Sequence, residues 1–483
     1  MTTTAPTPTK PSAPVASVAT PAGDAFLAEY AAQSRANGHA PAWLSERRAA
    51  AAALFAASGL PTTRQESWRK TNLQPLATIA FAHAESLAPA RSDESSAALD
   101  RLSLPAMGGH RLVFVNGAYD RDRSSIGPLP AGVTVTTLAE AWRAGDAAAA
   151  DHYGRYVDDA PFSAINTALA HDGALIVVPA GVHVETPIHL VFACDSGVDI
   201  RVDGRGDGRG DPRGDDRAAA SPVAHHPRVL IVAGANSRVT VVESYGGLGV
   251  GDVYLTNAVT EVVVAEGAEV DHTKRQLESE AAFHMSALHV VQTGASRFTN
   301  HNIALGGRLV RNDLAVQIDA SECDTLLHGL YMGHGRQHID NHTRLEHAQP
   351  HCHSFELYKG VLDGYATGVF TGRIKVYQDA QQTDAVQENR CLLLSDTATI
   401  NTQPQLEIFA DDVKCTHGAS VGELDVTQLT YLRTRGLPDA EAHGILTYAY
   451  ANEIIERIPV EAVRDELEGL VRSRVRESQR LRD

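Results

Sequence analysis

The sequence predicts a mainly β protein, with a long β-rich core between helical segments at both ends. Short runs of β-branched residues begin near residue 111, and each is bounded by Gly, Ala, Asn or Asp. Similar turn phrases recur at near-regular intervals: Gly234, Gly267 and Gly294 are 33 and 27 residues apart. Because no helical pattern separates the runs, a doubly wound α/β sheet is disfavoured. A β-solenoid and a β-sandwich both remain open.

The N-terminal part of the chain changes character at about residue 24. Residues 1–23 are rich in Thr, Pro and Ala and have no apolar segment, which predicts a disordered tail rather than a signal peptide. Residues 24–105 carry apolar side chains at helical spacing and predict a helical domain. Within it, the Ala-rich residues 44–55 should form a helix that stops at Gly59. We expect Trp68 to be a core residue.

Residues 106–422 are predicted to form the β core, without helical spacers. The β-branched runs that indicate its first strands are residues 112–115, 133–135, 175–178, 188–192, 229–232, 238–242 and 261–264. Residues 201–222 interrupt this pattern with a low-complexity segment in which Arg-Gly-Asp occurs three times. Its charges nearly cancel and apolar residues are scarce, so we expect a flexible, solvated insert.

The C-terminal residues 423–483 return to a helical pattern. Ile445, Leu446, Ala449 and the pair at 454–455 make an apolar stripe, and Pro459 marks its end. A second helix should follow, with its inward residues at Val460, Val463, Leu467, Leu470, Val471 and Val475. These helices either cap the β core or form a docking surface.

Composition excludes several functional classes. The 483 residues carry a formal net charge of −17, which disfavours nucleic acid as a partner. No apolar run reaches the roughly 18 residues of a membrane span. The five cysteines form no C-x-x-C motif and predict reduced thiols in a cytoplasmic protein. A phosphate-binding loop of the form G-x-x-x-x-G-K-[ST] is missing, so the chain itself should not hydrolyse ATP.

The strongest candidate site is the pair Cys415 and His417. The upstream residues and Val413 suggest a strand, on which Cys415 and His417 share one face with Cα atoms roughly 6.5–7 Å apart. Thiolate and imidazole suit iron–sulfur or zinc chemistry. Two ligands make only half of a site, because iron–sulfur clusters usually take four protein ligands. A cluster here would therefore need a partner chain.

A rival site is the triplet His351-Cys352-His353. On a strand, His351 and His353 would share one face at a spacing suited to a metal, which would give a mononuclear metal-binding β protein. A β-helix enzyme acting on carbohydrate is a weaker alternative, because the secretion signal common in that class is missing. The remaining thiols should be inert packed cysteines, namely Cys194, Cys323 and Cys391.

Several longer motifs resemble the SufB/SufD family of iron–sulfur cluster assembly scaffolds, and specifically its SufD type. The resemblance spans roughly residues 45–460. Its motifs are Glu66-Ser67-Trp68-Arg69-Lys70-Thr71, Pro161-Phe162, Ala164-Ile165-Asn166, Ala168, Tyr358-Lys359-Gly360-Val361, Phe370-Thr371-Gly372, the stretches 401–408 and 410–419, residues 431–436 and Ala449-Tyr450-Ala451. The family implies a right-handed parallel β-helix core with α-helical N-terminal and C-terminal segments, and a non-catalytic scaffold role in the SUF system.

The resemblance also implies partners and site residues. A chain of this type pairs with SufB as a heterodimer, and the ATPase SufC docks on the C-terminal helices at 423–483. In the family, the histidine matching His417 helps to hold the nascent cluster at the SufB–SufD interface, and the cysteine matching Cys415 lies beside it. Nothing here matches the SufB versions of those positions. The isolated chain could form a homodimer, and a flavin associated with the complex has no residues assigned here.

Overall fold

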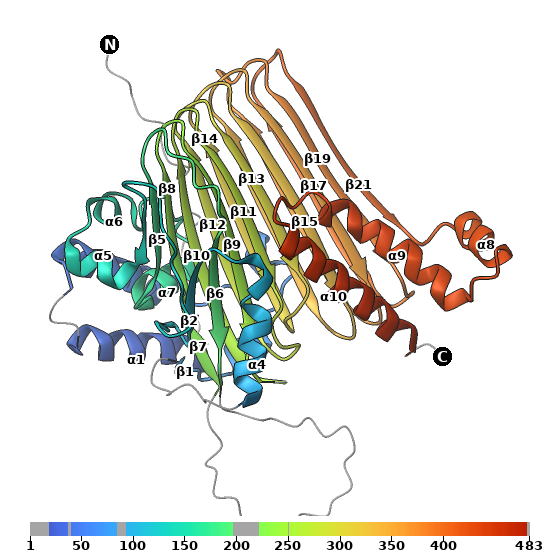
Figure 1. The fold of residues 1–483 in the computed structure, drawn as a ribbon, viewed down its shortest axis with the longest axis horizontal. Coiled ribbons are helices and arrows are strands. Elements are labelled where there is room, and N and C mark those ends of the chain that lie inside the picture. Colours follow the sequence, from blue (N-terminus) through green and yellow to red (C-terminus); the bar gives the residue numbers. More distant parts are fainter. Residues whose placement is uncertain (1–18, 37–39, 85–92, 197–221, 250, 481–483) are drawn as a thin grey trace, which may run out of the picture.

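Two long, stacked β-sheets form the centre of the computed structural model, with helices on their outer faces (Figure 1). The structure describes residues 19–36, 40–84, 93–196, 222–249 and 251–480. Most of the expected tail and almost all of the expected insert at 201–222 lie outside these residues.

The helices gather near the two ends of the chain. No helix among the described residues is long and apolar enough to cross a membrane. In chain order they are α1 (Pro21–Ala36), α2 (Ala42–Ser58), α3 (Gln74–Ala77), α4 (Asp93–Leu102), α5 (Leu138–Ala144), α6 (Ala147–His152), α7 (Pro161–Leu169), α8 (Val426–Thr434), α9 (Asp439–Ile455) and α10 (Glu461–Arg480).

The strands divide between two sheets. Sheet A contains β1 (Ala82–His83), β4 (Thr134–Thr137), β5 (Gly173–Val178), β7 (Val223–His225), β8 (Arg228–Ala233), β10 (Tyr254–Val264), β12 (Phe283–Gln292), β14 (Leu309–Ile318), β16 (His338–His347), β18 (Thr367–Val376) and β20 (Thr399–Ile408). Sheet B contains β2 (His110–Val115), β3 (Ala118–Tyr119), β6 (Ile188–Cys194), β9 (Arg238–Gly247), β11 (Glu269–Gln276), β13 (Arg297–Ala304), β15 (Asp324–Gly333), β17 (His353–Leu362), β19 (Asp384–Leu393) and β21 (Lys414–Gly422).

The pairing pattern decides between solenoid and sandwich. From β8 onward the chain alternates between the sheets, and each strand pairs in parallel with the strand two positions later. This alternation gives a β-solenoid of about 7 turns, from β8/β9 to β20/β21. One turn takes 27 residues between the paired positions Phe298 and Thr325, and 31 between Val239 and Val270. The near-regular turn phrases in the sequence therefore correspond to successive turns of one coil.

The corners of the coil also stack. Non-glycine residues adopt positive φ at equivalent corners, and their backbone N–H groups donate to the corner of the next turn. His351 N, for example, lies 2.9 Å from Gln381 O, and Gln382 N lies 2.6 Å from Asp412 O. These N–H groups thus find an acceptor only when the following turn is present.

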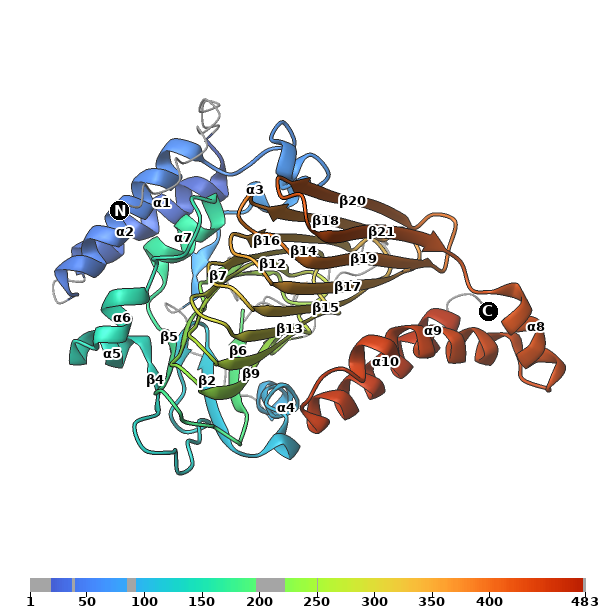
Figure 2. The same cartoon turned by 90° about the horizontal axis from the view of Figure 1, so that it is seen from above.

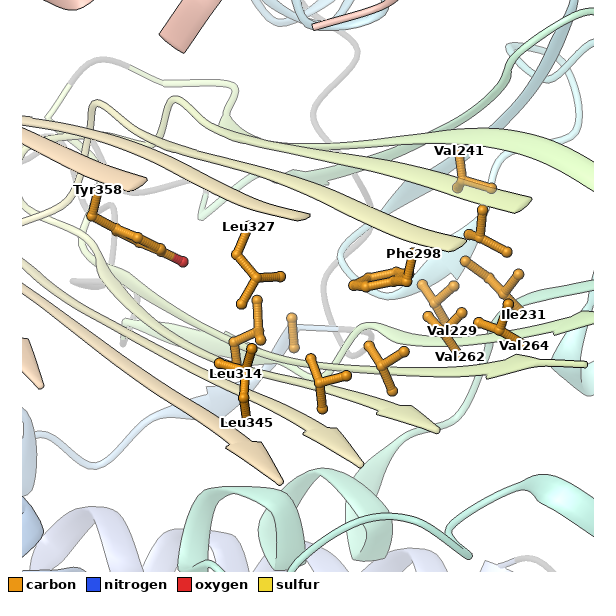
Figure 3. Close-up of a cluster of buried hydrophobic side chains, with 14 of the residues drawn as sticks. Val229, Ile231, Val241, Val262, Val264, Phe298, Leu314, Leu327, Leu345 and Tyr358 are labelled. Atoms are coloured by element: carbon orange, nitrogen blue, oxygen red, sulfur yellow. The ribbon is translucent and has the colours of Figure 1, made fainter. Parts of the chain in front are cut away.

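Apolar side chains from both sheets fill the interior (Figure 3). Val229, Ile231 and Val262 face Val241 and Phe298 across the coil. The outer faces are covered separately. The helices α1, α2 and α7 pack on sheet A, and α9 and α10 pack on sheet B (Figure 2). The predicted helix at 44–55 is α2, which ends before Gly59, and Trp68 is buried in the cluster on sheet A.

The expectation of a β core without helical spacers is wrong between β4 and β5, where α5, α6 and α7 intervene. Local capping explains these short helices. The side chain of Thr137 accepts from the N–H of Glu140 (3.1 Å), and that of Asp146 accepts from Ala149 (3.0 Å). Pro161 occupies the first turn of α7, where its missing N–H costs nothing. The regular coil therefore begins only after these helices.

A buried ion pair ties this helical insertion to the coil. The guanidinium of Arg228 on β8 pairs with Glu261 on β10, and both side chains are fully buried. Arg228 also donates to Asn166 on α7 (3.0 Å). Glu261 accepts from the backbone N–H groups of Gly154 (2.7 Å) and Tyr156 (3.1 Å). The Arg228–Glu261 pair thus provides hydrogen-bond acceptors for the loop before α7 and also links strands β8 and β10 of sheet A.

Replacing Glu261 with Gln should destabilise the protein by about 3 kcal/mol, because it leaves a buried guanidinium without its counter-charge. The midpoint of urea unfolding, followed by circular dichroism, measures the loss. The matched control is Glu269→Gln, which breaks an exposed pair with Arg238 (2.9 Å) and should cost less than about 1 kcal/mol. Equal, small shifts for both variants would contradict this role of the buried pair.

Candidate functional site at the open end of the solenoid

Cys415 and His417 both lie on β21, the last strand of sheet B. Among the described strands β21 pairs only with β19, so its second edge is unpaired, as is the outer edge of β20 in sheet A. Cys415 is opposite Ala385 and His417 is opposite Gln387. Both of these β19 residues are buried in the coil, so Cys415 and His417 share the inward-facing side of the strand at its open end.

The two side chains differ in environment. Cys415 is half-buried and packs against the interior apolar cluster, and this burial raises the pKa of its thiol. A metal that binds Cys415 must therefore displace a proton first. His417 is exposed at the rim of the coil. Its imidazole is the more accessible ligand of the pair.

Two polar residues continue inward from His417 along the same register. Gln387 on β19 stacks on His417, and Glu356 on β17 stacks on Gln387. Nε2 of Gln387 donates to the carboxylate of Glu356 (2.7 Å). Gly372 on the facing sheet leaves the room that the Gln387 side chain fills, since a Cβ there would lie 2.4 Å from Nε2. We call Glu356, Gln387 and His417 the polar row.

The inner end of the polar row is the carboxyl group of Glu356, whose pKa is raised. Glu356 is fully buried, and burial raises its pKa to about 7. Among the described residues, the Oε1 of Gln387 lies buried without a hydrogen-bond donor, whereas the side chain of Thr343 also interacts with the Glu356 carboxyl. Sequence reasoning missed both Glu356 and Gln387. They precede His417 by 61 and 30 positions, which are two turns and one turn of the coil, so a turn-by-turn alignment of the repeat would have found them.

The rival triplet does not form the predicted site. His351 is not on a strand: it occupies a corner with φ of +60°, and β17 begins only at His353. His353 lies 2.9 Å from the carboxylate of Asp324 on the neighbouring strand. The expectation that both imidazoles share one strand face is therefore wrong, and with it the metal site proposed from their spacing. Residues two positions apart share a face on a strand, but they do not do so at a corner of the solenoid.

Of the three cysteines that were predicted to be inert packed thiols, Cys323 differs from the other two. Cys194 and Cys391 are buried, and burial raises their pKa values. Cys323 and Cys352, however, are neighbours on successive corners, and both donate to the carbonyl of Ala320 (3.3 and 3.2 Å). The interaction with the neighbouring Cys352 thiol lowers the pKa of Cys323 to about 7. Cys323 is thus a buried thiol of lowered pKa rather than an ordinary packed one.

The C-terminal helices contain both a cap and an exposed surface. Val463, Leu467 and Val471 of α10 pack with the end of α9 on the outer face of sheet B. In contrast, α8 lies clear of both sheets (Figure 2). Val426 and Tyr431 on α8 and Ile445 on α9 are exposed apolar residues. We call these three residues the α8–α9 surface.

Glu356→Gln should flatten the pH dependence of stability. A carboxyl whose pKa is raised on folding stabilises the folded state at low pH, and this contribution is lost between about pH 4.5 and 7 as the buried group ionises. Relative to the wild type, the free energy of unfolding of the variant should therefore rise by up to roughly 3 kcal/mol between pH 5 and pH 8. Thermal unfolding at both pH values tests this. Glu388→Gln on β19 faces outward and serves as the control; a pH-independent difference for Glu356→Gln would contradict the burial argument.

Comparisons with known proteins place this arrangement in a family. Residues 216–450 match the family model described as SUF system FeS cluster assembly, SufBD core domain. Residues 24–190 match the SufBD protein N-terminal region. The first match includes β7 and the whole solenoid from β8 to β21, and the second runs from within α1 into β6.

Individual relatives agree. A SufBD family iron–sulfur cluster assembly protein of Synechocystis sp. is 32% identical over 450 residues, covering 92% of this chain and 93% of that protein. The iron–sulfur cluster assembly protein SufD of Escherichia coli is 28% identical, with 85% and 88% covered. SufD of Bacillus subtilis is 28% identical, with 67% and 69% covered. The chain belongs to the SufBD family of the SUF system for iron–sulfur cluster assembly.

Proposed function

We propose that this chain is a non-catalytic, cytoplasmic SufD-type scaffold subunit that pairs with SufB and holds part of a nascent iron–sulfur cluster between the two chains. One observation carries the proposal: Cys415 and His417 lie together on a strand whose outer edge is unpaired. The pair supplies at most two ligands, and the open edge gives a second chain access to the same place. The cluster is cargo in this role.

The open end has the properties of a protein interface. The last strands β20 and β21 expose backbone N–H and C=O groups along their outer edges, and such edges readily pair with strands of another chain. Ile408, Phe409 and Val421 are exposed apolar residues at this end. A SufB chain adding its strands here would bury them and bring its own ligands to His417. Without SufB, a second copy of this chain can use the same edges to form a homodimer.

The SufC ATPase is proposed to dock on the α8–α9 surface. Helix α8 is free of the sheets and exposes Val426 and Tyr431, and Ile445 is exposed on α9, whose buried side packs on sheet B together with α10. Deleting the whole segment would uncover the apolar outer face of sheet B, including Ile303 and Leu330. Point substitutions on α8 are therefore the cleaner test. No flavin site is assigned to this chain.

His417→Ala should lower the iron and acid-labile sulfide of the reconstituted complex with SufB and SufC, because the exposed imidazole is the more accessible ligand. Cys415→Ala should have a smaller effect, since burial raises the pKa of that thiol. Both are to be measured in complexes of equal subunit stoichiometry. His353→Ala removes an imidazole from the same solenoid away from the open end and should leave cluster content unchanged.

The role of His417 is rejected if the His417→Ala complex carries as much iron and sulfide as the wild type. Loss of the complex itself would instead assign His417 to subunit association. Analytical size exclusion of each variant with SufB separates these outcomes. His417 is exposed, so its truncation leaves no core cavity and should not unfold the chain.

The double variant Val426→Ser, Tyr431→Ser should weaken SufC binding at least about tenfold, because exposed aromatic and aliphatic anchors dominate such interfaces. Isothermal titration of SufC into the purified chain measures the affinity. The control Tyr365→Ser removes an equally exposed tyrosine from a corner of the coil. Unchanged affinity in the α8 variant would move the docking site elsewhere.

A further inference from the structure

A second group of metal-ligating side chains lies between α1 and the start of sheet A. Glu29 is on α1, His83 ends β1, and His171 is in the connection from α7 to β5. One ligand atom from each residue lies within 4.8 Å of the others. The side chain of Glu29 is 31% exposed, whereas that of His83 is only 9% exposed. Among the described residues, no other group of three His, Cys, Asp or Glu side chains comes together in this way.

We propose that Glu29, His83 and His171 bind a divalent first-row transition-metal ion. Two imidazoles and one carboxylate form a donor set that suits Zn²⁺, Fe²⁺ or Co²⁺ and leaves coordination positions open. The partly exposed carboxylate of Glu29 provides an entry path that a fully buried cluster would lack. Nothing in this inference depends on the proposed scaffold function, because the group is remote from the open end (Figure 1).

The three ligands are held by separate parts of the fold. Strand β1 pairs with β7, which places His83 opposite Ala224 and anchors it to sheet A. Arg48 on α2 donates to the carbonyl of Ala170 (2.6 Å), next to His171. Helix α1 packs through Phe26 in the apolar cluster on sheet A and so fixes Glu29.

Neighbouring groups support metal binding. The rings of His83 and His171 meet edge to face, with centroids 5.0 Å apart. Nε2 of Gln33 lies 3.0 Å from Oε1 of Glu29 and 3.4 Å from Nε2 of His83, so Gln33 orients both ligands. Burial lowers the pKa of His83, and burial together with the nearby His83 and Arg48 lowers that of His171 to about 3. Both imidazoles are therefore neutral at pH 7, which is the form that binds metals.

The test uses untagged full-length protein carrying Cys415→Ser and His417→Gln, so that the solenoid end contributes no ligands. After treatment with a chelator, Co²⁺ is titrated and followed by its visible absorption, and Zn²⁺ binding is measured by calorimetry. We expect one ion per chain. Glu29→Gln, His83→Gln and His171→Gln, made one at a time, should each weaken binding by about tenfold or more.

The matched control removes His351 and His353, two exposed histidines of the same chain, and should leave binding unchanged. Zn²⁺ should raise the melting temperature of the background protein and of this control, and should raise that of the three ligand variants by much less. Glu29→Gln is the mildest change, being half-buried on α1, and keeps the test valid if a histidine variant misfolds. Absence of stoichiometric binding, or affinities in the folded ligand variants within twofold of the background, would overturn the proposal.

Discussion

Parallel stacking of successive turns is the constraint on which the rest of this structure depends. Each strand satisfies its backbone groups through the turns before and after it, and the corners do the same. Among the described residues no further turn follows β20 and β21, so two strand edges remain open. The helices α5 to α7 and the Arg228–Glu261 pair sit near the other end of the coil. The coil thus has helices near one end and unpaired strand edges at the other. Cys415 and His417 lie at the end with the unpaired edges.

The same stacking organises the interior. Residues one turn apart stack on one another. A buried polar side chain on one turn therefore requires a hydrogen-bond partner on the adjacent turn. The interior is mostly apolar, yet Glu356, Gln387 and His417 follow a single register out to the rim. A buried carboxyl with a raised pKa therefore stands two turns behind an exposed imidazole.

Much of the site was predictable from local rules. Strand alternation correctly put Cys415 and His417 on one face, because both lie within β21. The same rule failed for His351, which occupies a corner with positive φ. Solenoid and sandwich could not be separated, since both use short β-branched strands and only the pairing partner differs. The group of Glu29, His83 and His171 left no sequence signal, because its members are 54 and 88 residues apart and meet only through packing.

Hydrogen–deuterium exchange of β21 tests the central claim most directly. In the isolated chain, the outward-pointing amides of residues 414–422 have no partner strand and should exchange quickly, whereas those of the central strands β13 and β15 exchange slowly. Addition of SufB should slow exchange at β21 and at β20 and leave the central strands unchanged. A stable complex with SufB in which β20 and β21 exchange as fast as in the isolated chain would contradict the claim that the open end of the coil is the interface.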